Sequence, residues 1–307
     1  MSSVVLFRRV AVLTAIGAYL QIALGSVVRV TGSGLGCPDW PLCHGRPYPP
    51  ADIHSIIEYS HRTVGTFTGV LVLATVVGAW MLFRSRRPAV AWLATAALLA
   101  YGAEGVLGAL VVFGELPSWL VAVHLGLAMI IVGGLIATAV LSMPGAQGVP
   151  DAGFKRLAAL AAGATYVMLL TGSTVVASKA DEGCNSWPLC GGGFALDFSG
   201  VNAFTMLHRG TVLVVTVLLL YVLTTAIRRW GEVGGMRITA AATIALLGLQ
   251  VAVGAASAFT DAALPNALHV ALATLVWSGV ITTAALTQPR ADRASAPSRL
   301  RVERTAV

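Results

Sequence analysis

Four histidines stand at matching places in a strongly apolar chain, and their spacing is typical of paired ligands. His61, His124, His208 and His269 each lie at or near the start of a long apolar stretch. We expect all four imidazoles at a similar depth, just inside one face of a membrane. A lone histidine in such a place often makes a hydrogen bond to a neighbouring helix. Four at one level favour a shared ligand instead.

Paired histidines on facing helices are how a helical bundle holds a haem or a metal ion. A six-coordinate haem iron needs two axial ligands, and two histidines supply them. Zinc usually takes a third or fourth ligand, and the sequence offers no obvious one around His208 and His269. The chain has no CxxCH motif, which excludes covalent c-type attachment. Arg62 and Arg209 directly follow a histidine and are placed to pair with haem propionates. Anchoring at the membrane interface is the alternative for both.

The composition predicts an all-α polytopic membrane protein. Of the 307 residues, 57% are hydrophobic and only 11% are charged, whereas soluble domains carry about 25% charged residues. The net charge of +7 fits basic helix ends better than a nucleic-acid partner. A bilayer needs about 20 apolar residues per helix. Eight spans fit this length: Val10–Val30, Thr63–Phe83, Val90–Phe113, Trp119–Leu141, Leu157–Ser178, Phe204–Ile227, Ile238–Phe259 and Asn266–Thr287.

The basic residues predict the orientation of these spans. With the N-terminus in the cytoplasm, 15 of the 20 Lys and Arg residues are cytoplasmic, as the positive-inside rule requires. The C-terminus is then cytoplasmic as well. The five outer exceptions lie beside the motifs described here: Arg29, Arg46, Arg62, Lys179 and Arg209.

The chain repeats itself at an offset of about 147 residues. The loop CPDWPLCHG from Cys37 returns as CNSWPLCGG from Cys184, and SHRTVG from Ser60 is echoed by LHRGTV from Leu207. We therefore predict two pseudo-twofold-related four-helix bundles that face the same way. The predicted parts are an N-terminal half (1–145), a cytoplasmic linker (146–156), a C-terminal half (157–287) and a basic cytoplasmic tail (288–307).

The two halves differ where chemistry would matter. Glu58 lies one helical turn before His61, and its counterpart is Thr205. A carboxylate in an apolar setting is a candidate proton acceptor or cation stabiliser, and helix capping is the alternative. Glu104 has Gln250 as its counterpart, and its role stays open. The second half resembles a plain electron-transfer site, and the first half a reaction site.

A glycine recurs near the outer end of each odd-numbered span. Close helix packing through small residues explains this pattern, and so does a surface cleared for a large planar ligand. The glycines are Gly25, Gly108, Gly172 and Gly254.

Both cysteine loops fall on the outer side, where disulfides form. Cys37–Cys43 and Cys184–Cys190 can each close a small ring. A structural staple over a haem pocket is the favoured interpretation for Cys184–Cys190. For Cys37–Cys43 a thiol–disulfide relay is a second interpretation, because this loop belongs to the reactive half.

Taken together, these residues resemble the haem A synthase family. The resemblance covers all eight spans and rests on EYSHR with Glu58 and His61, HLG with His124, HR with His208, His269, and the two cysteine loops. It implies an oxidoreductase that converts the C8 methyl of haem O to a formyl group by two successive oxidations, giving haem A for cytochrome oxidase. It also implies that His208 and His269 ligate a haem b cofactor, that His61 and His124 serve the haem O substrate, and that Glu58 is catalytic.

Localisation and partners follow from the same resemblance. We expect a multi-pass protein of the cell membrane that takes haem O from the bilayer, with haem O synthase (protohaem farnesyltransferase) and cytochrome oxidase assembly factors as possible partners. Two rivals remain at this stage. A dihaem b-type electron carrier explains four histidines and the repeat, but not the single Glu58. A transporter with parallel repeats would carry no haem.

Overall fold

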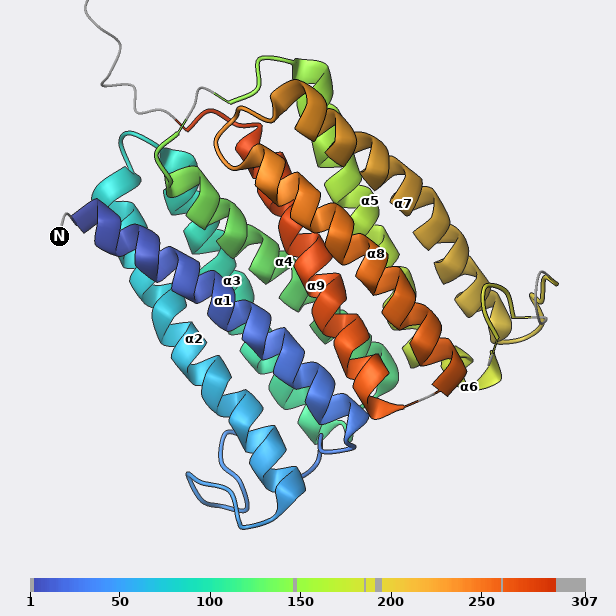
Figure 1. Cartoon of the computed structure of the whole chain (residues 1–307). Coiled ribbons are helices and arrows are strands. Elements are labelled where there is room, and N and C mark those ends of the chain that lie inside the picture. Colours follow the sequence, from blue (N-terminus) through green and yellow to red (C-terminus); the bar gives the residue numbers. More distant parts are fainter. Residues whose placement is uncertain (1–2, 146–147, 185, 191–194, 261, 291–307) are drawn as a thin grey trace, which may run out of the picture.

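The computed structural model is built from helices that run side by side (Figure 1). It describes residues 3–145, 148–184, 186–190, 195–260 and 262–290, and no β-strand forms within these ranges. Eight helices are long and apolar enough to cross a membrane, which confirms the predicted fold class. The helices are α1 (Ser3–Val30), α2 (Ile53–Phe83), α3 (Pro88–Phe113), α4 (Ser118–Ser142), α5 (Ala152–Ala177), the short α6 (Ala180–Gly183), α7 (Asn202–Trp230), α8 (Met236–Thr260) and α9 (Ala263–Leu286).

The largest departure from the predicted spans is the start of α2. The helix begins at Ile53 instead of Thr63 because Asp52 caps it, accepting a hydrogen bond of 2.9 Å from the Ser55 amide. Hydropathy alone misses this segment, since Glu58 and its polar neighbours interrupt the apolar run. Both Glu58 and His61 therefore lie on regular helix, which fixes their directions relative to each other.

Each half contains the same set of helix neighbours. In the first half α1 packs on α2 and α4, and α3 packs on α2 and α4. In the second half α5 packs on α7 and α9, and α8 packs on α7 and α9. A pseudo-twofold relation between the halves stays a prediction, as do the boundaries of the halves and the linker. Most of the predicted tail, residues 291–307, lies outside the described residues.

The halves meet where α9 packs on α1 and α4 and where α5 packs on α4. Helices α4 and α9 stand at the centre of the bundle in Figure 1. The Trp277 indole on α9 donates a 2.8 Å hydrogen bond to the Met129 carbonyl on α4. Gly133 makes room for that indole, because a Cβ atom there would lie 3.2 Å from the ring. A buried indole needs such a partner for its N–H, so this contact fixes one helix against the other.

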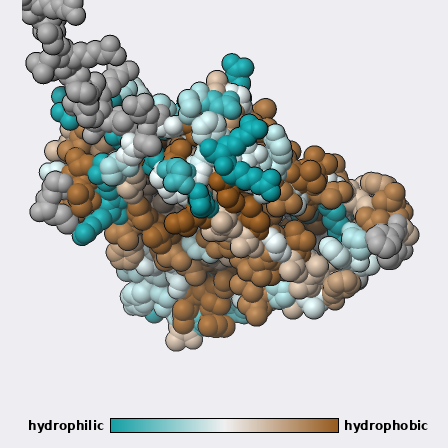
Figure 2. All heavy atoms as spheres, turned by 45° about the horizontal axis from the view of Figure 1, so that its top comes forward, coloured by the Kyte–Doolittle hydropathy of each residue, from teal (hydrophilic) through white to brown (hydrophobic). Residues whose placement is uncertain are grey.

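The outer faces of the helices are apolar, as lipid contact requires. Large side chains such as Phe67, Trp92, Leu213 and Ile238 are exposed. In Figure 2 the hydrophilic residues gather where the upper helix ends of Figure 1 come forward, and hydrophobic residues cover much of the remaining face in view. This distribution supports a multi-pass membrane protein.

Candidate functional site

Each of the four predicted histidines lies against one of the four predicted glycines. A Cβ atom placed on Gly25 would lie 3.1 Å from Cε1 of His61, and the same distance is 3.3 Å from Gly108 to His124. In the second half it is 3.0 Å from Gly172 to His208 and 2.8 Å from Gly254 to His269. The glycines therefore clear room for imidazole rings, which neither sequence interpretation had foreseen.

A polar side chain on the same neighbouring helix contacts each ring. In the first half Gln21 Nε2 lies 3.2 Å from His61 Nε2, and Glu104 Oε1 lies 3.1 Å from His124 Nδ1.

In the second half Thr171 Oγ1 lies 3.0 Å from His208 Nδ1, and Gln250 Nε2 lies 3.1 Å from His269 Nδ1. Gln21, Glu104 and Gln250 all stand four residues before the glycine of their helix, which is one turn. That spacing is the signal by which the sequence could have revealed them.

The histidines of each half lie within range of each other's charge. Within a half the two protonated rings would repel each other electrostatically, His61 with His124 and His208 with His269. No group of three or more metal-ligating side chains converges within the described ranges. Two histidines per half match the two axial positions of a haem iron.

Several buried polar atoms at this level lack a hydrogen-bond partner among the described residues. They are Nδ1 of His61 and of His124, Oε2 of Glu104, and Oε1 of Gln21 and of Gln250. An unsatisfied buried polar group costs about 1–3 kcal/mol, so such a cluster is typical of a ligand site. The pairs of glycine-cleared rings fit a haem in each half, and four of the five orphaned atoms lie in the first half.

Glu58 and Arg62 hold the first cysteine loop. Glu58 is 3% exposed, its Oε1 pairs with Arg62, and its Oε2 accepts a 2.8 Å hydrogen bond from the Cys37 amide. Arg62 also donates to the carbonyl oxygens of Cys37, Asp39 and Leu42 at 2.6–2.7 Å. Glu58 is thus a buried carboxylate that joins the outer loop to the helix of His61.

Arg209 contacts the second loop in a similar way, and among the described side chains no carboxylate pairs with it. It donates to the carbonyl oxygens of Ser186 at 2.7 Å and Pro188 at 3.2 Å. Thr205, the counterpart of Glu58, instead donates to the Ala180 carbonyl. Both arginines therefore lie on loop carbonyls, and their contact with haem propionates stays a prediction.

Both predicted disulfides form. Cys37 bonds to Cys43 and Cys184 bonds to Cys190, each pair six positions apart. In the first loop the Asp39 carboxylate accepts hydrogen bonds from the amides of His44 (2.6 Å) and Gly45 (2.7 Å). The Gly45 amide is the main cause that lowers the pKa of Asp39 below its ordinary value of 3.8, and the His44 amide adds to it.

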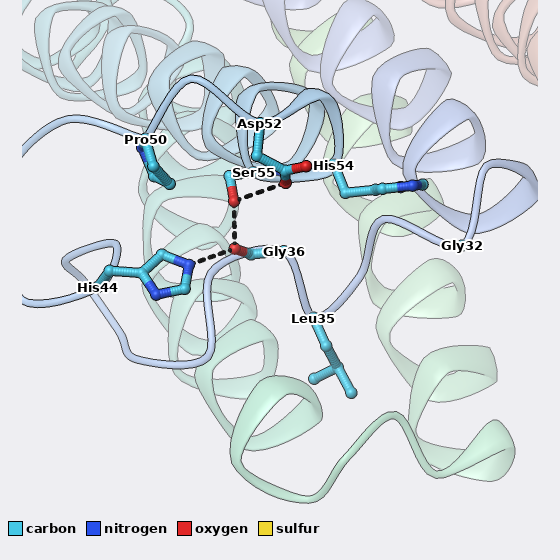
Figure 3. A pocket seen from close by; sticks show the side chains of 8 residues that line it. All are labelled: Gly32, Leu35, Gly36, His44, Pro50, Asp52, His54 and Ser55. Atoms are coloured by element: carbon cyan, nitrogen blue, oxygen red, sulfur yellow. Dashed lines mark hydrogen bonds between the residues drawn. The ribbon is translucent and has the colours of Figure 1, made fainter.

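An open pocket of about 480 Å³ lies beside the first loop (Figure 3). Its polar groups already bond to one another: His44 Nε2 and Ser55 Oγ both contact the Gly36 carbonyl, at 3.0 and 2.6 Å. Ser55 Oγ also donates to Asp52. The pocket belongs to the structure of the loop, and it is separate from the four histidines.

Comparison with known proteins agrees with this geometry. A family model described as "Cytochrome oxidase assembly protein" matches residues 8–281. A heme A synthase from Alkalihalophilus pseudofirmus is 31% identical over 291 residues, which span 91% of this chain and 96% of the relative. The chain belongs to the haem A synthase family. A second such enzyme, from Halalkalibacterium halodurans, is 30% identical over 269 residues, covering 85% of this chain and 88% of the relative.

Family membership covers all four histidine positions and both cysteine loops, because the matched segment runs from α1 into α9. A heme A synthase from Shouchella clausii matches 223 residues at 31% identity, covering 69% of this chain and 73% of the relative. The family and the paired histidines point to the same class of ligand.

Proposed function

We propose that this protein is a haem A synthase, which oxidises the C8 methyl of haem O to a formyl group in two successive steps. Family membership supports the reaction. The observation that carries it to this chain is the set of four ring sites, two per half, each made of a histidine, a glycine and a polar contact. Two sites suit one substrate haem and one cofactor haem.

The cofactor site belongs to the second half, with His208 and His269 as ligands of haem b. Its ring contacts, Thr171 and Gln250, are uncharged, and Thr205 replaces the acid of the first half. When bound, haem b would supply one-electron transfer. The residues around it orient two imidazoles and exclude water.

The substrate site belongs to the first half, where His61 and His124 would hold haem O. Both acids near the histidines lie here, Glu58 one turn before His61 and Glu104 against His124. The expected chemistry passes from the methyl through an alcohol to a hydrated aldehyde, which loses water. Each of the two oxidations adds one oxygen atom, and when that atom comes from water the step releases two protons and passes two electrons to an external acceptor.

Glu58 is the residue placed to handle a proton or a developing positive charge in this half. Its carboxylate is buried, so its electrostatic effect on a nearby cationic carbon is strong. Arg62 and the Cys37 amide hold both oxygens in place, which pre-organises the group. For Glu58 to accept a proton, one of these contacts gives way.

The surroundings follow from the same proposal. The charge pattern supports cytoplasmic termini, with the cysteine loops and both haem sites towards the outer face. Arg62 and Arg209 stand at the edge of these sites, where each guanidinium could form an ion pair with a haem propionate. The partners would be haem O synthase, which supplies the substrate, and assembly factors of cytochrome oxidase, which receives the product.

Co-expression with a haem O synthase in a host that lacks haem A tests the reaction. Haems are then extracted and separated, and we expect haem A or its alcohol precursor. Extracts that contain haem O and haem b alone would favour the dihaem electron carrier. A purified protein with no Soret band would exclude both.

A further inference from the structure

We propose that Glu104 is a positioning residue that orients His124 and strengthens it as an iron ligand, so that the two haem sites differ in redox potential. The inference rests on the proposed function, because it takes His61 and His124 as the ligands of haem O.

The geometry around His124 carries the first step. Oε1 of Glu104 lies 3.1 Å from Nδ1 of His124, and the Glu104 side chain is only 13% exposed. The contact falls outside hydrogen-bond geometry. Nδ1 of His124 and Oε2 of Glu104 both lack a hydrogen-bond partner in the part of the chain that the structure describes. A hydrogen bond between the two groups therefore requires one side chain to change its orientation.

Iron binding defines what that bond would be. When Nε2 of an imidazole binds a metal, Nδ1 carries the ring hydrogen and donates it to a neighbouring acceptor. A carboxylate in this position fixes the ring orientation and raises the basicity of the ligand. A more basic ligand stabilises ferric over ferrous iron and lowers the midpoint potential.

The second half provides the comparison. Gln250 stands at the position that Glu104 holds in the first half, and its Nε2 lies 3.1 Å from Nδ1 and 3.3 Å from Nε2 of His269. An amide offers the ring a neutral contact in place of a charged one. Gln21 and Thr171, which contact the remaining two rings, are also uncharged. Among the four side chains that contact the rings, Glu104 is therefore the one that carries a charge.

Redox titration of the purified protein, co-expressed with haem O synthase, tests the proposal. The variants are Glu104→Gln and Gln250→Glu, which exchange the two groups. Glu115→Gln is the matched control, since Glu115 is exposed in the loop between α3 and α4. Each preparation is titrated by its absorption spectrum, and its haems are extracted and counted.

We expect two redox steps in the wild type. Glu104→Gln should raise the midpoint potential of one step by about 59 mV. At a fixed solution potential, this lowers the ferric-to-ferrous ratio of that haem about tenfold, as expected for one electron. Gln250→Glu should lower the other step, and Glu115→Gln should move neither.

Unchanged potentials in Glu104→Gln, with two haems bound, would overturn the role of Glu104. If Glu104→Gln loses the haem of the first half, the Gln250→Glu variant decides. An unchanged potential in that variant would overturn the proposed effect of a carboxylate on the histidine ligand. A wild-type protein that binds a single haem rejects the two-site assignment of the proposed function, and the inference with it. The haem count therefore separates the two failures.

Discussion

A Cβ atom at Gly254 would lie 2.8 Å from Cε1 of His269. Carbon atoms in folded proteins do not approach so closely without displacement, because van der Waals contact begins near 3.5 Å. Glycine at this position is therefore what allows the imidazole to lie against α8. The same relation holds at Gly25, Gly108 and Gly172, with distances of 3.0–3.3 Å.

Gly254→Ala should reduce the haem b that remains on the purified protein, because the new methyl group pushes His269 out of place. The measurement is the haem b content per chain after extraction. Gly248→Ala on the same helix is the control, since no atom outside the local helix backbone lies within 4 Å of its Cβ position. Alanine favours helix over glycine by about 1 kcal/mol, so the control should keep its haem and its stability.

The histidine pairs should separate by function. His208→Ala or His269→Ala should lower the retained haem b, because each removes one axial ligand. His61→Ala or His124→Ala should block conversion of haem O while the haem b spectrum is largely kept. Absorption spectra and haem extraction measure both effects. Loss of haem b from the His61 or His124 variants would reverse the assignment of the two halves.

Glu58→Gln should keep the fold but lower haem O conversion by about 100-fold or more, the range typical of a lost general acid or base. The amide retains an acceptor for the Cys37 N–H but cannot take a proton or hold a negative charge. The rate of haem conversion in the co-expression assay is the measurement.

The control for Glu58 lies at its counterpart in the second half. Thr205→Val removes the hydrogen bond to the Ala180 carbonyl and should leave conversion close to that of the wild type. Full activity in Glu58→Gln would limit Glu58 to supporting the loop through Arg62 and Cys37.

Removal of either disulfide should destabilise the protein. Each bond closes a ring of about seven residues and lowers the entropy of the unfolded chain. Removing it therefore lowers the free energy of unfolding by about 2 kcal/mol. Thermal unfolding of Cys37→Ala/Cys43→Ala and of Cys184→Ala/Cys190→Ala in detergent measures this loss. We expect both variants to keep measurable conversion, since Arg62 and Arg209 still hold the loops. A complete loss of turnover confined to the first pair would favour a thiol–disulfide relay.

The first loop should weaken in acid. Because the Gly45 and His44 amides lower the pKa of Asp39 below 3.8, its charge stabilises the folded loop above pH 3.8. That contribution is lost as the pH falls through the lower folded pKa. The melting temperatures of wild type and Asp39→Asn, compared from neutral pH downwards, should differ above pH 3.8 and converge only once the pH falls below the folded pKa of Asp39. A difference that persists at the lowest pH would contradict this origin.

The sequence by itself determined the number of spans and the internal repeat, and it predicts which histidines act as pairs. These features are local, because hydropathy over about 20 residues and repeated motifs need no knowledge of packing. The start of α2 escaped this reasoning, since the Asp52 cap lies beyond a polar segment that hydropathy excludes from the membrane.

The contacts between helices were decided only by the tertiary structure. The glycines meet histidine rings, Arg62 lies on loop carbonyls, and Glu104 faces His124. Each contact depends on how far one helix is rotated and shifted against its neighbour, which the side chains of both helices set together. The sequence of one helix alone therefore does not determine these contacts.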